Sequence, residues 1–366
     1  MRKALKVVAL LAALPLVLVG GLYAFAMAQH WQPPARQDEP VHNPPDVAAL
    51  AIGQPFTVVS WNLQFGTGRS WHFFYDGGDD VLSTDPVTEE TVAAITSALS
   101  RLAPDIALLQ EVDRDSRRSG NKDQLPRYAE AMPGSAVTTA TYYKSAFVPT
   151  PGPTFMGKVL MDLVVFSRFK IDKAERVQLA MLDEPALRQA FNLKRALQIV
   201  AIPVDGWPEP LMVAQTHLSA FSKGDGTLQK QVAVLEEWMA SRPPNQPWIM
   251  AGDFNLLPMG DDPARLAVQD DSYDQENNAI GSVWPRFQEV SGDQVLDPAQ
   301  RTYIPFGASE PDRKIDWAFY GGPLQLLESQ VHSEHLLSDH LPMRMVFRVG
   351  EPPPPPPLPE PVAPSP

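Results

Sequence analysis

The sequence contains no cysteine, and this absence excludes several kinds of chemistry. A chain of 366 residues without cysteine has no disulfide, no thiolate metal site, no cysteine nucleophile and no lipid-bearing cysteine. Two common catalytic loops are also missing, the Gly-x-x-x-x-Gly-Lys-Ser/Thr phosphate loop and the Gly-x-Ser-x-Gly turn. The sequence therefore disfavours phosphate-loop nucleotide hydrolysis and serine esterase chemistry.

Positive charge is scarce. The formal net charge is -13, and 44% of the residues are apolar, which is enough for a sizeable core. An acidic domain gains no long-range attraction towards a nucleic acid backbone or an anionic lipid surface. The balance argues against tight, nonspecific nucleic acid binding, although an enzyme that neutralises a phosphate with metal ions stays compatible with it.

The chain begins with a predicted targeting segment, residues 1–30. Arg2, Lys3 and Lys6 precede an uninterrupted apolar run over residues 7–28. That run approaches the ~20 residues that span a bilayer, so we expect a signal anchor with a transmembrane helix. Residues 26–28, Ala-Met-Ala, also fit a cleavage site, so a cleaved signal peptide is the alternative. In both cases the rest of the chain is expected outside the cytoplasm. With an uncleaved anchor it would be attached to the membrane in the cell envelope, and after cleavage it would be secreted or periplasmic.

Proline marks the other boundaries of the folded part. Residues 31–54 carry five prolines among polar residues and are expected to form an extended linker. Residues 350–366 are dominated by proline and are expected to form a disordered tail. A single catalytic domain is therefore predicted over residues 55–349, with no obligate protein partner evident.

Short apolar runs within this domain predict strands at 56–61, 105–110, 163–166, 196–202, 211–215, 248–250, 315–320 and 341–349. Helical spacing of apolar residues predicts two helices, one from Asp85 and one from Thr227. Strands outnumber helices and do not alternate with them regularly. This order predicts an α/β or α+β sandwich instead of a regular βαβ array.

The most informative stretch is residues 248–255, Trp-Ile-Met-Ala-Gly-Asp-Phe-Asn. Three apolar residues indicate a buried strand, and Gly252 allows a sharp turn. Asp253 and Asn255 follow at alternate positions, so an extended path would place both on one side. Two small polar groups at the end of a buried strand suit a catalytic site, but the same residues are also common in ordinary turns.

Similar polar side chains recur at the ends of other predicted strands. They are Asn62, Glu111, His217, Asp316, Asp339 and His340. Each alone is more often a turn residue, a solvated carboxylate or a structural histidine. If all these ends meet at one edge, they form an oxygen-rich site with two imidazoles. Such a site suits a hard divalent cation, Mg²⁺ or Mn²⁺, and no His/Cys spacing for structural zinc is present.

Six motifs in this order resemble the endonuclease/exonuclease/phosphatase superfamily. They are Ser60-Trp61-Asn62, Leu109-Gln110-Glu111-Val112, Thr216-His217-Leu218, Gly252-Asp253-Phe254-Asn255, Lys314-Ile315-Asp316-Trp317 and Ser338-Asp339-His340-Leu341-Pro342. The resemblance covers essentially all of residues 55–349. It implies a four-layer sandwich with two packed mixed β-sheets flanked by helices. It also implies Mg²⁺-dependent phosphoester hydrolysis by attack of a metal-activated water.

The resemblance also implies a role for each residue. Glu111 would be the main metal ligand, with Asn62 holding the metal and phosphate geometry and Asp339 serving a second metal position or water. Asp253 would orient or deprotonate the attacking water, and Asn255 would bind a phosphate oxygen. Asp316 would fix the tautomer of His340, which contacts the scissile phosphate. His217 would stabilise phosphate charge or protonate the leaving oxygen.

Some positions depart from the pattern or leave the substrate open. Gln64 stands where some relatives carry a carboxylate, and no carboxylate partner for His217 is evident. The motif with His217 resembles the branch that contains pancreatic deoxyribonuclease, bacterial sphingomyelinases and inositol-phosphate phosphatases, whereas abasic-site repair nucleases lack this histidine. The aromatic stretch 71–75 either contacts a base or a lipid surface or packs its own loop. Lys194 and Arg195 either contact a phosphate or form surface salt bridges.

Two enzyme hypotheses follow, and a third is disfavoured. The first is an exported phosphodiesterase or phosphatase that acts on lipid headgroups or small phosphoesters. The second is an extracytoplasmic nuclease on DNA or RNA. A noncatalytic binding module is disfavoured because the motif set is intact. The acidic charge and the predicted membrane attachment favour the first hypothesis over the second.

Overall fold

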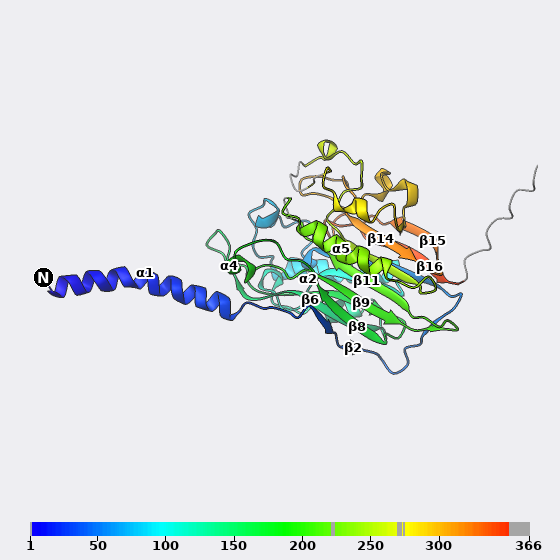
Figure 1. Cartoon of the computed structure of the whole chain (residues 1–366), viewed down its shortest axis with the longest axis horizontal. Coiled ribbons are helices and arrows are strands. Elements are labelled where there is room, and N and C mark those ends of the chain that lie inside the picture. The colour runs from blue at the N-terminus through cyan, green and yellow to red at the C-terminus, as the bar shows by residue number, and fades with distance from the viewer. Residues whose placement is uncertain (1, 221–223, 269–272, 274, 351–366) are drawn as a thin grey trace, which may run out of the picture.

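Two seven-stranded sheets form the centre of the chain in the computed structural model, which describes residues 2–220, 224–268, 273 and 275–350 (Figure 1). Sheet I has the order β1 (Arg36–Asp38), β8 (Lys173–Gln178), β9 (Ala196–Ile202), β11 (Leu211–His217), β12 (Trp248–Asp253), β14 (Asp316–Gly321) and β13 (Gln288–Glu289). Sheet II has the order β15 (Leu324–Val331), β16 (Met343–Val349), β4 (Pro55–Asn62), β5 (Ile106–Asp113), β7 (Gly157–Ser167), β6 (Ala136–Val148) and β2 (Val41–His42). A parallel pair of β10 (Val204–Asp205) and β3 (Leu50–Ala51) lies apart from both sheets.

The helices are few. The α-helices are α1 (Arg2–Ala28), α2 (Asp85–Leu102), α3 (Leu125–Ala129), α4 (Ala186–Gln189) and α5 (Thr227–Ala240). Short 3₁₀ turns occupy the loops, at η1 (Gln64–Gly66), η2 (Phe74–Asp76), η3 (Arg117–Ser119), η4 (Pro263–Arg265), η5 (Ala279–Ser282), η6 (Gly292–Gln294) and η7 (Pro298–Gln300).

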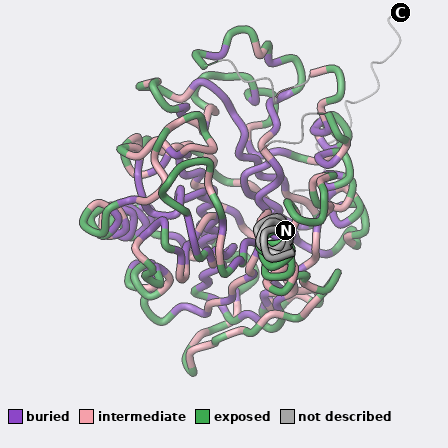
Figure 2. The backbone as a smooth tube through the Cα atoms, turned by 90° about the vertical axis from the view of Figure 1, so that its left-hand side faces the viewer, coloured by how far each residue is buried: buried purple, intermediate pink, exposed green. Residues whose placement is uncertain are grey.

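Three apolar clusters separate four layers and confirm the predicted sandwich. The central cluster joins the facing sides of the sheets, with Val58 and Phe347 from sheet II against Val213 and Ile249 from sheet I. The second packs α5 on the outer side of sheet I. The third packs α2 and α3 on the outer side of sheet II. Figure 2 shows the buried backbone inside the domain and exposed loops around its margin.

Helix α2 shows how the sequence produces this layering. Its apolar residues recur three or four positions apart, so one stripe faces sheet II, and Val92, Ile95, Leu99 and Leu102 on that stripe are buried. Pro86 fits the first turn because that turn needs no amide donor there. The helix ends at Ala103, which adopts a left-handed conformation and donates its amide to the Leu99 carbonyl.

The pairing of the strands explains why distant polar residues meet. Strands β4 and β5 are parallel, and so are β11 and β12, so their carboxyl ends share an edge within each sheet. Strand β14 runs antiparallel to β12, with Asp316 opposite Asp253. Strand β16 runs antiparallel to β4, with Met343 opposite Ser60, so the residues before Met343 lie where β4 ends.

One expectation about the chain outside residues 55–349 changes, and one stays untested. The predicted linker 31–54 is not free, because β1, β2 and β3 within it pair with β8, β6 and β10. Extended, proline-containing chain suits edge strands because an edge needs only some of its amide groups. Residues 351–366 of the predicted tail lie outside the described residues.

The expected transmembrane helix is not supported. Residues 2–28 form α1, but in the part of the chain that the structure describes no helix has the length and apolarity needed to cross a membrane.

Candidate active site

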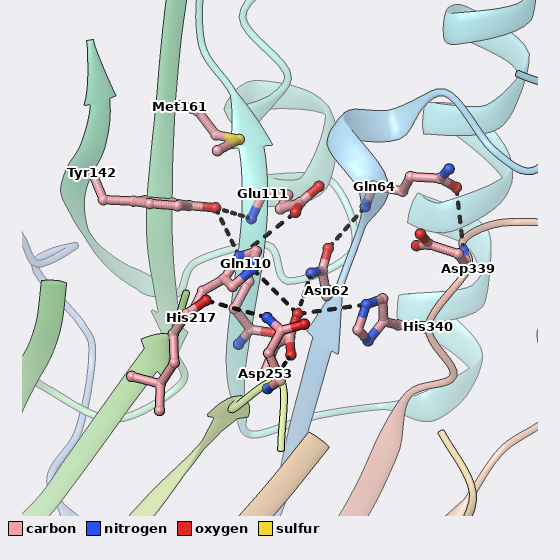
Figure 3. Close-up of polar contacts among 12 residues, drawn as sticks. Asn62, Gln64, Gln110, Glu111, Tyr142, Met161, His217, Asp253, Asp339 and His340 are labelled. Carbon is pink, nitrogen blue, oxygen red and sulfur yellow. Dashed lines mark hydrogen bonds and ion pairs between the residues drawn. The ribbon is translucent and has the colours of Figure 1, made fainter. Parts of the chain in front are cut away.

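One carboxylate oxygen lies at the centre of the site. Asp253 Oδ2 accepts a hydrogen bond from Asn62 Nδ2 at 3.0 Å. His217 Nε2 lies 3.3 Å from the same oxygen, and His340 Nε2 lies 3.5 Å from it. Figure 3 shows these side chains converging from strand ends of both sheets. The structure thus brings together residues 62, 217, 253 and 340, as the sequence predicted, and all four are buried.

The path from Asp253 to Asn255 differs from the expected extended one. Asn255 is left-handed, with φ +51°, and its amide nitrogen donates to Asp253 Oδ1 at 3.0 Å. This local turn is characteristic of aspartate, whose side chain mimics a backbone acceptor. The Asn255 side-chain amide donates to the Leu218 carbonyl at 3.2 Å. Asp253 and Asn255 still line the same cavity, but through a turn and not through strand alternation.

His340 and Asp316 form a buried hydrogen-bonded pair, as predicted. His340 Nδ1 lies 2.8 Å from Asp316 Oδ2, so Nδ1 carries a proton and Nε2 faces Asp253. Burial alone would lower the pKa of His340. The carboxylates of Asp316, Asp253 and Asp339 outweigh burial and raise that pKa well above its ordinary value. These carboxylates therefore favour the protonated form of His340.

His217 has the opposite electrostatic character. Burial, together with the nearby charges of Arg195 and His340, lowers its pKa well below the ordinary value. A neutral His217 donates through one nitrogen only and is a poor proton donor to a leaving group. Its Nδ1 lies 3.3 Å from the Tyr142 hydroxyl and 3.6 Å from Glu111 Oε1. The partner that the sequence did not reveal is therefore Tyr142, with Glu111 close by.

Glu111 lies at a bulge in β5. The register between β5 and β7 shifts between Leu109 and Val112, and Glu111 adopts φ +59°. Its amide donates to the Tyr142 hydroxyl at 3.1 Å, which satisfies the donor that the bulge removes from the ladder. Burial, followed by repulsion from Asp339, raises the pKa of the Glu111 carboxyl. The bulge therefore points the Glu111 carboxylate into the cavity, beside His217.

Asp339 is positioned through its backbone. Its amide donates to Gln64 Oε1 at 3.2 Å, and Ser338 Oγ bridges the Asn62 carbonyl at 2.7 Å and Asp339 Oδ1 at 3.2 Å. Gln64 thus holds the segment that carries Asp339. Burial is the main cause that raises the pKa of Asp339.

Asp76 is a further acidic residue at the site, and the sequence analysis did not identify it. It lines the cavity with Glu111 and Asp339. Asp76 is exposed at its own position, but desolvation by the surrounding protein and repulsion from these two carboxylates raise its pKa to about 7. Asp76 follows the aromatic stretch 71–75, which drew attention to the aromatic side chains instead of the acid.

The donor set fits a divalent cation. Glu111, Asp339 and Asp76 are carboxylates whose pKa values are raised, mainly by desolvation, and for Glu111 and Asp76 also by repulsion from neighbouring carboxylates. Carboxylate and amide oxygens are the ligands that Mg²⁺ prefers. Ligand atoms of Asp253, Asp316 and His340 also lie within 4.8 Å of one another. In that trio Asp316 is already hydrogen-bonded to His340 Nδ1, so the three residues are better suited to hold a proton than to bind a metal ion.

Arg195 supplies positive charge to the cavity. The side chains of Lys194 and Arg195 are both buried, so neither belongs to a surface salt bridge. Lys194 Nζ donates to the Gln189 carbonyl, whereas Arg195 lines the cavity and its Nη1 has no hydrogen-bond partner among the described residues. The Arg195 guanidinium therefore has a buried N–H group that no described residue satisfies.

The aromatic stretch 71–75 mainly packs its own loop. Phe73 is buried and contacts Phe65 edge to face, with ring centroids 4.7 Å apart. His72 stacks on Phe306 at 3.6 Å. Phe74 and Tyr75 line the cavity beside the polar residues.

The sequence matches the Endonuclease/Exonuclease/phosphatase family over residues 59–340, which is most of the chain. No curated protein sequence is detectably similar to it. Solved structures share the fold at low identity. The endonuclease/exonuclease/phosphatase from Beutenbergia cavernae has 21% identity and a TM-score of 0.57, with 81% of this chain and 72% of that chain covered. The corresponding protein from Bacteroides vulgatus has 13% identity and a TM-score of 0.53, with 81% and 100% covered.

The human nocturnin catalytic domain, solved with a bound sulfate anion, has 15% identity and a TM-score of 0.50, with 85% of this chain and 97% of that chain covered. These likenesses agree with the two packed sheets, and the family match extends across every motif from β4 to His340. The chain therefore belongs to the endonuclease/exonuclease/phosphatase family, whose members are divalent-metal-dependent hydrolases of phosphoesters.

Proposed function

We propose that the protein is a Mg²⁺-dependent hydrolase that cleaves a phosphodiester or phosphomonoester by attack of water. The observation that carries this proposal is the convergence on Asp253 Oδ2 of Asn62 Nδ2, His217 Nε2 and His340 Nε2 within 3.5 Å. Phosphoester hydrolysis needs an oriented water, positive charge at the nonbridging oxygens and help for the leaving group.

Asp253 orients the water and accepts its proton. Burial and the neighbouring Asp316 raise the pKa of Asp253 to about 7, against the lowering influence of His340. A general base whose pKa is near the working pH is substantially deprotonated and still has enough affinity for a proton to accept one from water. The amide of Asn62 holds one Asp253 oxygen in place and the Asn255 amide nitrogen holds the other.

His340 and Arg195 stabilise the phosphate. His340 is held protonated by Asp316, and its Nε2 points towards the centre of the site. Arg195 adds a buried guanidinium without a carboxylate partner among the described residues. His217 is neutral, so it orients the phosphate as a hydrogen-bond donor, and His340 becomes the better candidate to protonate a leaving oxygen.

Glu111, Asn62 and Asp339 would hold the cation. Mg²⁺ or Mn²⁺, when bound, supplies positive charge against the phosphate oxygens and favours ionised water as the nucleophile. Binding would also relieve the repulsion between the Glu111 and Asp339 carboxylates, which burial strengthens.

We also propose that the domain acts outside the cytoplasm, as a secreted or periplasmic enzyme. Three basic residues before the apolar run at 7–28 support this location, as does the Ala-Met-Ala sequence at 26–28. A phosphatase fusion to residues 1–54 would test it: activity confined to the cytoplasm would contradict export.

A substrate panel tests the proposed reaction. Plasmid DNA, RNA, sphingomyelin, phosphatidylinositol phosphates and bis-4-nitrophenyl phosphate are each incubated with Mg²⁺, with Mn²⁺ and with EDTA. We expect metal-dependent release of product from the small ester and a lipid ester, with loss in Glu111→Ala, Asp253→Ala and His340→Ala. Glu237→Ala, at an exposed position of α5, is the control. Turnover of DNA or RNA alone would favour the alternative, an extracytoplasmic nuclease.

A further inference from the structure

The cavity beside the catalytic residues has two unlike kinds of lining. It encloses about 430 Å³, which lies within the size range of small-molecule sites. Polar side chains from Asn62, Glu111, Arg195, His217, Asp253 and His340 form one part of the lining. A packed group of apolar side chains forms another part, and the phosphoester chemistry proposed above uses none of them.

We define the apolar chamber as Val148, Met156, Met161, Phe191 and Leu193, all of which line the cavity. The first three come from the hairpin of β6 and β7 and are buried. The last two come from the segment between α4 and β9 and are half-buried. Figure 3 places Met161 beside Glu111 and Tyr142. The chamber therefore begins next to the predicted metal ligand.

Apolar side chains continue from the chamber to the surface. Met181, which also lines the cavity, is 42% exposed, and Phe155, adjacent to Met156, is 43% exposed. The chain after α1 is fastened to this rim, because the Gln29 side chain exchanges two hydrogen bonds with the Phe147 backbone at 3.1 and 2.9 Å. An apolar group longer than the chamber would thus meet apolar atoms at its mouth.

The charges of the cavity fit a substrate with one phosphate and not a polyanion. Two arginines line it, Arg118 and Arg195. Arg118 is committed to Asp113 by two hydrogen bonds of 3.0 Å and covers the Phe65 ring at 3.8 Å. Arg195 is then the arginine of this lining left to meet a phosphate, beside His340 at the catalytic centre, so neighbouring phosphates of a nucleic acid would face apolar walls or carboxylates.

We propose that the substrate is an amphiphilic phosphoester, with an alkyl chain attached to one ester oxygen, and that the chamber binds this alkyl chain. This inference rests on the proposed function for the position of the phosphate. Water adds its oxygen to phosphorus, the bond from phosphorus to the other ester oxygen breaks, and that oxygen leaves with a proton. The alkyl phosphate remains as the second product. Methionines at three places in the lining suit chains of different shape, because their side chains adapt.

A series of 4-nitrophenyl alkyl phosphates with methyl, butyl, hexyl and octyl groups tests the chamber with a constant leaving group. The full chain is assayed with Mg²⁺ below the concentration at which the esters form micelles. We expect kcat/KM to rise by up to about fourfold for each methylene that the chamber buries, and then to level off. A value that does not change from methyl to octyl would overturn the proposal and leave the proposed function intact.

Leu193→Asn puts a polar group into the chamber. We expect kcat/KM for the octyl ester to fall at least about tenfold, while that for the methyl ester changes by less than about twofold. Leu327→Asn, at a 46% exposed position of β15, is the matched control and should affect neither ester. Phe191→Ser is a second chamber variant if Leu193→Asn fails to fold, as judged by circular dichroism. Equal losses for both esters in the folded variants would refute the chamber.

Binding separates this inference from the proposed function. Octyl phosphate and methyl phosphate are titrated into the full chain by calorimetry with Mg²⁺. If octyl phosphate binds more tightly than methyl phosphate and Leu193→Asn abolishes the difference, the chamber is supported even if no ester is hydrolysed. The lack of hydrolysis would then contradict the proposed function alone. Equal affinities for octyl phosphate and methyl phosphate would refute the chamber, whether or not the protein hydrolyses the esters.

Discussion

His340 and Asp316 lie on chain segments that enter the site from different sheets, and their side chains meet at 2.8 Å in its interior. Asp316 begins β14 of sheet I, whereas His340 precedes β16 of sheet II. The ion pair therefore joins the two sheets at the catalytic edge, and the charge of His340 depends on how the sheets pack.

Replacing Asp316 should change the charge of His340. In Asp316→Asn the burial that lowers the pKa of His340 would be opposed by fewer carboxylates, so the pKa of the imidazole should fall. We expect kcat to fall about 10²- to 10⁴-fold. An NMR titration of His340 in EDTA-treated protein measures the pKa directly. Asp293→Asn, at an exposed position, is the control. An unchanged His340 titration in Asp316→Asn would contradict the pairing.

The same pair gives a pH dependence to stability. The pKa of His340 is raised on folding, so its contribution to the free energy of unfolding is complete below the unfolded value of about 6.5 and is lost as pH rises through the folded value. The stability difference between wild type and Asp316→Asn should therefore be largest in mildly acid solution and shrink at alkaline pH. Urea unfolding in EDTA across this range would show the trend, and a difference that grows with pH would count against it.

The ionised Glu111 carboxylate should lower the stability of the metal-free protein while being required for metal-dependent activity. Burial, then repulsion from Asp339, raises its pKa, so the ionised carboxylate destabilises the metal-free fold at neutral pH. We expect Glu111→Gln to have a higher free energy of unfolding and a higher melting temperature than wild type in EDTA, and to lose metal-dependent turnover. Glu237→Gln on α5 should change neither property.

Magnesium should then stabilise only the wild type. A ligand present at one hundred times its dissociation constant adds about 2.7 kcal/mol to the free energy of unfolding. Thermal unfolding with increasing Mg²⁺ should raise the melting temperature of wild type and Glu237→Gln but not of Glu111→Gln. An equal response of all three proteins would remove Glu111 from the ligand set.

Tyr142 should matter to both Glu111 and His217. Tyr142→Phe leaves the Glu111 amide without its acceptor and the His217 Nδ1 without the hydroxyl at 3.3 Å. An orphaned buried amide costs about 1–3 kcal/mol, and we expect a loss of about tenfold or more in kcat as the bulge relaxes. Tyr320→Phe removes a hydroxyl at the far end of β14 and serves as the control. Wild-type activity and stability in Tyr142→Phe would show that the hydroxyl does not hold the bulge.

Tyr142 also shows where prediction from the sequence stopped. Asn62, Glu111, His217, Asp253 and His340 could be placed together because each follows a short apolar run, and the parallel pairs β4–β5 and β11–β12 do bring those ends to common edges. Strand β6, which carries Tyr142, was not predicted, because its run of Thr, Ala and Tyr is only weakly apolar. The alternating burial of β6 becomes evident only once β7 pairs with it. Contacts between strands distant in sequence, such as that of Tyr142 with His217, leave no local pattern.

Gly252 gives the last prediction and corrects the reason for its presence. The sequence predicts a sharp turn at this glycine, but Gly252 lies within β12, opposite Thr216 of β11. Its φ is +143°, and an added Cβ would lie 2.0 Å from the Thr216 carbonyl oxygen, a contact that no side-chain motion relieves because both atoms belong to paired strands. Gly252→Ala should cost about 3–5 kcal/mol and displace Asp253 from His217. Gly260→Ala, also at positive φ (+81°) but with nothing within 4 Å of an added Cβ, should cost only about 1–2 kcal/mol. Urea midpoints that are equal for the two variants would mean that β11 and β12 do not approach each other this closely at the catalytic edge.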